Sequence, residues 1–213
     1  MILAGFDIAT NTGLTIDDGK IIRARSWRAK AKRPFGLKAT EIDEGYEAEI
    51  AEEFRDFVLS TLIAEHVTDV GYEKPRTRDF ERTKVEIDTS SEWAGQAFKK
   101  TTERSSSNLA MVRGIVLCAV LLGVCRRLNI PAMPIPADDW RKSILGYSRA
   151  PKGVKDGRTH LKKAVMEQCR RLGVQVANDD AADSVGVVFH LRALLAPYGK
   201  KVGDLFEKDG AGV

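Results

Sequence analysis

The sequence is poor in the residues that bind soft metals or cross-link a chain. Its 213 residues include three cysteines and three histidines, and none of them has the spacing of a zinc site. Cys118 and Cys125 fall on one apolar helical stripe, and Cys169 lies on another predicted helix. A dispersed, odd-numbered set is typical of reduced core thiols. We therefore expect no zinc and a cytoplasmic location.

Long hydrophobic segments are also scarce. The longest apolar run, Gly114 to Val124, is shorter than the roughly 20 residues that span a bilayer. The N-terminus has no basic flank followed by an apolar stretch, so we expect no signal peptide and no membrane partner. The composition, 43% hydrophobic and 30% charged, is that of an ordinary globular chain. We expect one domain over residues 1–197 and a loosely ordered tail over 198–213.

The excess of positive charge is small but unevenly distributed. A net charge of +4 with a pI of about 8.9 permits a nucleic-acid partner without requiring one. Residues 20–38 hold eight basic residues and no acid, and residues 141–163 hold eight basic residues against Asp156 alone. Each segment can be a phosphate-binding surface or simply a solvated face. The sequence leaves both readings open.

Hydrophobic periodicity and turn residues predict a mixed α/β fold. Apolar residues at helical spacing indicate helices, and short apolar runs between Gly, Asn and Pro indicate strands. The predicted strands are 2–8, 13–17, 20–28, 67–73 and 130–136, the last of them edge-like. The predicted helices are 41–65, 108–128, 139–145 with Asp138 as its cap, 158–172 and 180–196. Three antiparallel strands followed by βα units predict a five-stranded mixed sheet with helices on both faces.

Residues 76–107 show no sustained period. The segment is rich in Ser, Thr and mixed charge, and a loop of this length in a compact domain is usually functional. We predict a mobile loop with a short helix around Trp93 to Phe98.

Four acidic residues fall where a metal-dependent nuclease needs them. Asp7 and Glu73 each end an apolar run, and Asp180 and Asp183 form a D-x-x-D pair that opens an apolar helix. Positions i and i+3 share a helix face, and carboxylates without Cys or His suit Mg²⁺ or Mn²⁺. Such a set can hold two ions for an in-line displacement at phosphorus. Each acid alone has a plainer reading as a turn, a strand end or a helix-dipole partner, the role we assign to Asp179.

Five motifs in order along the chain carry a resemblance to a known family. They are Gly5-Phe6-Asp7-Ile8-Ala9-Thr10-Asn11-Thr12-Gly13, Gly71-Tyr72-Glu73-Lys74-Pro75, Asn108-Leu109-Ala110-Met111-Val112-Arg113-Gly114, Gly146-Tyr147-Ser148-Arg149-Ala150-Pro151-Lys152 and Asp180-Ala181-Ala182-Asp183-Ser184. Together they resemble the motifs of the RuvC family of Holliday-junction resolvases, in the RNase H-like nuclease superfamily.

The resemblance implies a homodimer that nicks two like-polarity strands of a four-way DNA junction, leaving 5′-phosphate and 3′-hydroxyl ends. It implies Asp7, Glu73, Asp180 and Asp183 as catalytic residues and ligands of two Mg²⁺ ions per site, for which Mn²⁺ can substitute. It further implies that Lys152 contacts the scissile-strand phosphates and that Arg141 stands where the family has a lysine. The remaining candidate DNA-binding residues are Arg76, Arg78, Phe80, Lys142, Arg149 and Lys155.

Departures from the family pattern leave other functions open. Ile8-Ala9 replaces the Pro-Gly of the first motif, and Ser148 replaces a loop glycine, so the substrates can extend to forks, flaps or other branched DNA. The divergence suggests a phage or prophage origin. An ATPase of the actin/hexokinase type shares the Asp and the Thr/Gly turn of the first strand, but no second phosphate loop is found. A non-catalytic DNA-binding protein is the third reading.

Overall fold

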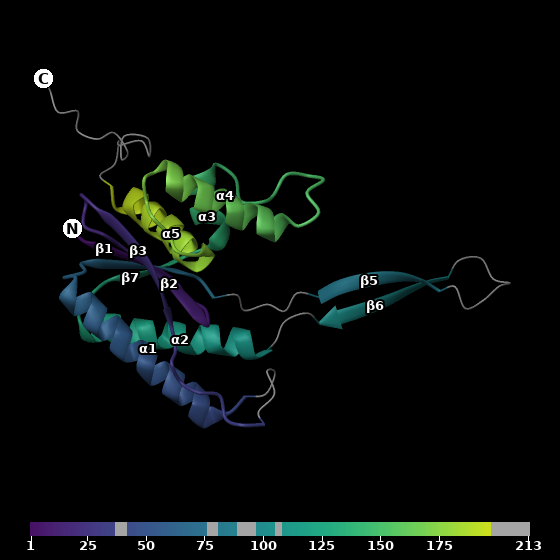
Figure 1. Cartoon of the computed structure of the whole chain (residues 1–213), viewed down its shortest axis with the longest axis horizontal. Helices are drawn as coiled ribbons and strands as arrows, with labels where there is room; N and C mark the ends of the chain where they lie inside the picture. Colours follow the sequence, from purple (N-terminus) through teal and green to yellow (C-terminus); the bar gives the residue numbers. More distant parts are fainter. Residues whose placement is uncertain (37–41, 76–80, 89–96, 105–107, 197–213) are drawn as a thin grey trace, which may run out of the picture.

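The chain folds around a five-stranded mixed sheet, shown in the computed structural model of Figure 1. The structure describes residues 1–36, 42–75, 81–88, 97–104 and 108–196. The strands, in sheet order, are β3 (Ile22–Arg28), β2 (Asn11–Asp17), β1 (Leu3–Asp7), β4 (Asp69–Glu73) and β7 (Ala132–Ile135). β1, β2 and β3 pair antiparallel, whereas β1, β4 and β7 pair parallel. The predicted mixed sheet is therefore confirmed.

The turns of the sheet follow from local residue chemistry. Between β2 and β3, the Asp17 carboxylate accepts from the Gly19 N–H at 2.9 Å, and Gly19 has a φ of 85° that favours glycine. β7 is an edge strand, as predicted, which suits Pro134 because proline has no N–H to donate to a further strand. The hairpin thus leads the chain into β3, and the parallel strands follow on the other side of β1.

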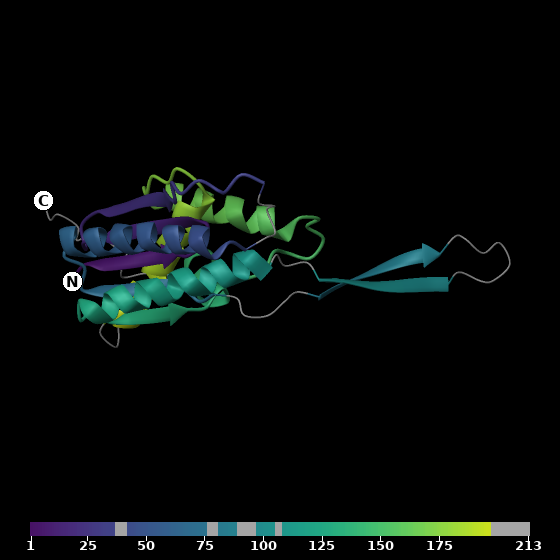
Figure 2. The same cartoon turned by 90° about the horizontal axis from the view of Figure 1, so that it is seen from below.

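Two long helices, α1 (Glu44–Ala64) and α2 (Asn108–Arg127), cover one face of the sheet. Figure 2 shows them running side by side. Asp43 caps α1 by accepting from the Tyr46 N–H at 2.7 Å. The buried side chains of this layer include Phe6, Phe54, Val58, Leu62, Leu117 and Leu121. Burial of such side chains contributes about 1.5–3 kcal/mol each, so this layer fixes the position of both helices.

α2 also has the length and composition of a membrane span. Residues Leu109–Arg127 form 19 helical residues with a mean hydropathy of 2.1, so the apolar stretch is longer than the run Gly114 to Val124 suggested. Its inner side packs on the sheet and on α1 as a core helix does. Cys118, Cys125 and Cys169 are free and buried, in agreement with the prediction of unpaired core thiols.

Three helices cover the opposite face: α3 (Ala137–Leu145), α4 (Gly157–Arg171) and α5 (Asp179–Leu195). α5 lies across β1 and β2 and packs against both other helices. Its cap is Asn178, which accepts from the Ala181 N–H at 2.9 Å. The predicted cap of α3 is wrong, because Pro136 occupies the cap position and Asp138 lies within the first turn. A carboxylate there still interacts favourably with the helix dipole.

The segment after β4 forms a two-stranded ribbon, which corrects the predicted loop. β5 (Glu81–Asp88) and β6 (Ala97–Arg104) pair antiparallel and extend away from the sheet (Figures 1 and 2). Ala97 and Phe98, placed in a predicted helix, begin β6, while 93–96 lie outside the described residues. Opposite charges occupy paired register positions: Glu81 with Arg104, Arg82 with Glu103 and Glu86 with Lys99. Opposite charges at paired positions favour a hairpin. Because these positions are charged, the sequence shows no hydrophobic alternation that would predict a strand.

Candidate metal centre

Asp7 and Glu73 stand at the same edge of the sheet. β1 and β4 are parallel neighbours, with Phe6 in register with Tyr72. The next residue of each strand is therefore the predicted acid, so both carboxylates leave the sheet at adjacent carboxyl ends. The sequence prediction that two strand ends converge here is confirmed by the register.

Two glycines allow α5 to approach this edge. A Cβ on Gly13 would lie 1.8 Å from the carbonyl oxygen of Asp180, and one on Gly5 would lie 2.5 Å from Val188 Cγ2. A buried hydrogen bond of 2.7 Å between Thr15 and Ser184 holds the helix at this depth. The first turn of α5 is thereby held against β2, which brings Asp180 and Asp183 to the end of β1.

The four predicted carboxylates interact electrostatically. Burial raises the pKa of Asp7 well above its usual value, and the charges of Glu73, Asp183 and Asp180 raise it further. Burial, followed by the charge of Glu73, raises the pKa of Asp183 to about 7. The pKa of Asp180 is raised mainly by burial and then by Asp179. Acids that repel one another at close range favour the binding of cations, which offset their negative charge.

Glu73 is held by a buried tryptophan on the neighbouring helix. The indole Nε1–H of Trp140, on α3, donates to Glu73 Oε2 at 2.8 Å. Trp140 is fully buried, and a Cβ on Gly186 of α5 would lie 2.3 Å from its ring. The Arg141 guanidinium lies 4.8 Å from the centre of the Trp140 ring and lowers the pKa of Asp183. α3 therefore both orients a carboxylate and brings a cation to the site.

The donor set suits a hard divalent ion. All four candidate ligands offer carboxylate oxygens, which Mg²⁺ and Mn²⁺ prefer, and burial of several negative charges together is costly without cations. Within the part of the chain that the structure describes, no three acidic, histidine or cysteine side chains are already gathered in ligating geometry. A bound cation would offset the repulsion between these carboxylates.

The structure describes five of the eight predicted DNA-binding residues. Arg141 is half-buried beside Trp140 and acts on Asp183. The other described candidates, all exposed on α3 or on the 146–156 segment that precedes α4, are Lys142, Arg149, Lys152 and Lys155. Arg76, Arg78 and Phe80 lie outside the described residues. Exposed cations are accessible to a polyanion such as DNA.

Several residues that build the site escaped the sequence reading. Arg113 donates through both Nε and an Nη to the carboxylate of Glu47 and also reaches Thr10 Oγ1 at 3.3 Å. It thus fastens α1, α2 and the turn after Asp7 together, a bidentate geometry that only arginine supplies. Its place in the third motif was the available signal. Trp140 gave none, because nothing in the sequence relates it to Glu73.

His190 takes no part among the acids. Its Nδ1 lies 2.7 Å from the hydroxyl oxygen of Ser143 on α3, and burial lowers its pKa. The contact links α5 to α3.

Sheet order, flanking helices and the acidic strand ends define an RNase H-like fold of the RuvC type. Two solved structures of Thermus thermophilus RuvC show this likeness. One matches with a TM-score of 0.51 at 15% identity, covering 91% of this chain and 96% of that one. The other, in complex with a Holliday junction substrate, matches with a TM-score of 0.53 at 13% identity, covering 92% and 96%.

A third solved structure, the yeast mitochondrial Holliday junction resolvase Ydc2, gives a TM-score of 0.45 at 12% identity over 96% of this chain and 77% of that one. The fold assignment rests on the Thermus structures. Comparison by sequence with known protein families and with curated proteins finds no match.

Proposed function

We propose that this protein is a metal-dependent endonuclease that cleaves branched DNA, with four-way junctions as its principal substrate. The observation that carries the proposal is that Asp7, Glu73, Asp180 and Asp183 gather at one sheet edge, where the charges of the other three raise the pKa of Asp7 and the charge of Glu73 raises that of Asp183. The related fold of Thermus thermophilus RuvC is solved with a Holliday junction substrate, which supports branched DNA as the ligand. The products would be 5′-phosphate and 3′-hydroxyl ends.

The chain's own residues divide the work of such a reaction. Asp7, Glu73, Asp180 and Asp183 would hold two Mg²⁺ ions, with Mn²⁺ as a substitute. When bound, the ions supply an activated water and stabilise the leaving oxygen. Trp140 fixes the orientation of Glu73 through its indole N–H. Gly13 and Gly5 admit α5, so that Asp180 and Asp183 reach the edge. Burial around Asp183 restricts water at the site.

Positive charge next to the acids would meet the DNA backbone. The described DNA-binding candidates all follow β7 in the chain: Arg141 and Lys142 lie on α3, and the exposed Arg149, Lys152 and Lys155 lie in the segment that precedes α4. Phosphate contacts by lysine and arginine give an affinity that falls steeply with salt. Shape then supplies selectivity, because only a branched duplex offers several arms to the same protein surface.

A homodimer fits the outer side of α2. Ile115, Val116 and Leu122 are 43%, 38% and 38% exposed there, and Ala119 and Gly123 complete an exposed stripe. Small residues on such a stripe let two helices approach closely, and a two-fold dimer presents the two sites that paired nicks require. A second copy, rather than a membrane, would therefore cover α2. Leu122→Glu should convert a dimer into a monomer in sedimentation, whereas a wild-type monomer would contradict the dimer.

The function is tested by incubating the protein with labelled four-way junction, fork and linear duplex in Mg²⁺, with Asp7→Asn alongside. Symmetric paired nicks on the junction, lost in the variant and with chelator, are expected. Junction binding should survive the substitution because the basic residues remain. Cleavage by Asp7→Asn would remove Asp7 from the site.

Forks and flaps are the second candidate substrates. The β5–β6 ribbon follows β4 and extends away from the sheet, so it would give such substrates an additional surface to contact. Cleavage of forks but not junctions in the same experiment would establish this alternative. Metal-independent binding without any cleavage would instead indicate a non-catalytic DNA-binding protein, and ATP binding would then be the next test of the ATPase reading.

A further inference from the structure

Lys162 lies on the side of α4 that faces α5. Lys162, Val165 and Cys169 follow helical spacing, and the last two are buried against α5, where the Cys169 thiol lies 3.9 Å from the Ala182 carbonyl oxygen. The ammonium of Lys162 forms an ion pair with Asp179 in the first turn of α5. Both side chains are about one-third exposed, at 31% and 34%. Lys162 thus reaches the beginning of α5 from a packed helix, unlike a free surface lysine.

Lys162 is a cation that acts electrostatically on three of the four candidate ligands. Its charge lowers the pKa values of Asp7, Asp180 and Asp183, against the larger effects that raise them. Among the described residues, Arg141 acts in this way on Asp183 and Arg158 on Asp180. The ammonium is therefore within electrostatic range of these three acids.

Asp179 determines where the ammonium rests. Asp179 is not one of the four candidate ligands, and its pKa is lowered, first through its hydrogen bond with Lys162. A lysine side chain has four flexible methylenes, and without a fixed partner its ammonium would settle among the carboxylates. The ion pair with Asp179 holds it beside them.

Charge balance indicates what the lysine does. Two divalent ions would neutralise the four carboxylates, and a bound phosphodiester would then add a negative charge without a partner. A preorganised cation at that point stabilises charge that builds on the phosphate during cleavage. We propose that Lys162, positioned by Asp179, is a further substrate-contacting residue of this nuclease, with its ammonium directed at an oxygen of the cleaved phosphate. The inference rests on the function proposed above.

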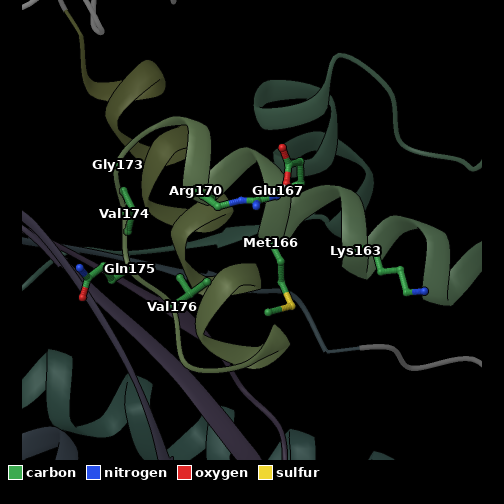
Figure 3. Close-up of a pocket in the computed structure, with 8 residues that line it drawn as sticks. All are labelled: Lys163, Met166, Glu167, Arg170, Gly173, Val174, Gln175 and Val176. Atoms are coloured by element: carbon green, nitrogen blue, oxygen red, sulfur yellow. Dashed lines mark ion pairs between the residues drawn. The ribbon is translucent and has the colours of Figure 1, made fainter.

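The test compares Lys162→Met with Lys163→Met. Figure 3 shows Lys163 lining a pocket with Met166 and Arg170, between α4 and the 173–176 segment, so the control removes the same charge from the neighbouring position. The first measurement is Mn²⁺ binding to the protein without DNA, followed by electron paramagnetic resonance. Lys162→Met should bind Mn²⁺ about 3- to 10-fold more tightly, because a competing cation has gone. Lys163→Met should match the wild type.

The second measurement is single-turnover junction cleavage at saturating metal. Lys162→Met should lower the cleavage rate about 10- to 100-fold with little change in KM, because a contact that strengthens in the transition state is lost. Lys162→Arg should restore part of the rate. A structural defect would lower the melting temperature and weaken metal binding, so opposite changes in metal affinity and rate separate the two. Lys162→Gln serves as a second variant in case the methionine variant does not fold.

Asp179→Asn tests the positioning role. Freed from its partner, Lys162 should move among the carboxylates, so Mn²⁺ binding should weaken, opposite to the effect of Lys162→Met. In the double variant with Lys162→Met the substitution should have little further effect, because the residue through which Asp179 acts is absent.

The outcomes distinguish this inference from the proposed function. Wild-type Mn²⁺ affinity in Lys162→Met overturns the placement of the lysine at the metal site. Tighter metal binding with a wild-type cleavage rate overturns the substrate contact while the nuclease stands. A wild-type protein that cuts no DNA overturns the proposed function, and the substrate contact with it.

Discussion

Gly13 lies directly against the backbone of Asp180. A Cβ on Gly13 would meet the Asp180 carbonyl oxygen at 1.8 Å, its carbonyl carbon at 2.5 Å and the Ser184 side chain at 3.1 Å. Backbone atoms cannot give way as the end of a flexible side chain can, so any larger residue must move the start of α5. The contact of Gly13 with Asp180 therefore determines whether Asp180 and Asp183 come close to the third candidate ligand, Asp7.

Gly13→Ala should consequently impair both folding and catalysis. Overpacking of this kind costs about 1–3 kcal/mol, and a shift of Asp180 and Asp183 should lower cleavage about 100-fold. The control is Gly114→Ala in α2, where a Cβ meets nothing within 4 Å and alanine favours the helix. Denaturant unfolding and junction cleavage measure the two effects. Wild-type activity in Gly13→Ala would show that catalysis does not require α5 to lie this close to β2.

The raised pKa of Asp183 predicts how metal-free stability depends on pH. The folded protein retains the Asp183 proton up to a pKa of about 7, whereas the unfolded chain loses it near the ordinary value of 3.8. Stability from this group is therefore lost as pH rises from about 4 to 7, and the full penalty is present above 7. Asp183→Asn should stabilise the metal-free protein at pH 8 by about 2–4 kcal/mol.

At pH 4 the stabilisation by Asp183→Asn should fall below about 1 kcal/mol, because Asp183 is then protonated in the folded protein and partly protonated in the unfolded chain. Thermal unfolding in chelator at both pH values checks this. The Mn²⁺ affinity of the wild type should also rise by about tenfold for each unit by which the pH increases up to 7. Above 7 it should level off, because the ion then no longer displaces a proton. Equal stability of wild type and variant at pH 8 would show that Asp183 carries no penalty.

The bond from Trp140 to Glu73 predicts a loss of metal affinity in Trp140→Phe. The indole N–H donates to Glu73 Oε2 at 2.8 Å, and its removal frees the carboxylate to rotate, which weakens metal binding by about 10-fold. Trp27→Phe is the matched control, because Trp27 stacks on Phe57 with ring centres 5.6 Å apart and touches no candidate ligand. Both variants lose ring volume. An equal Mn²⁺ affinity in both would leave Trp140 with a packing role alone.

Removal of the β5–β6 ribbon should separate junction recognition from the metal site. The ribbon extends away from the sheet (Figure 2), and its two strands pair with each other alone among the described strands. Replacement of 79–103 by a short Gly-Ser linker should leave the melting temperature and Mn²⁺ binding unchanged. We expect junction opening, followed with fluorophores on two arms, to weaken, because aromatic residues of the segment can stack on exposed bases. Unchanged junction cleavage would exclude this role.

The sheet and most helix bounds could be predicted from sequence because they depend on local patterns. Alternating and helical apolar periods gave β1 to β4 and α1, α2, α4 and α5 within a few residues of their observed ends. The ribbon was missed because its segment shows no sustained hydrophobic alternation, and the register that places Glu86 opposite Lys99 joins positions that no short window along the chain relates. The cap of α3 was misplaced because the helix begins after Pro136 without a side-chain cap.

The sequence by itself determined which residue types were available at each strand end and helix start: acids with hard oxygen donors at Asp7, Glu73, Asp180 and Asp183, and cations after β7. It did so because each lies within a local pattern that fixes its element. The tertiary structure decided how those acids are held. The hydrogen bond from Trp140 to Glu73 and the ion pair of Lys162 with Asp179 each join residues from different elements. Such contacts depend on how the helices pack on the sheet. The glycines at positions 5 and 13 permit that packing.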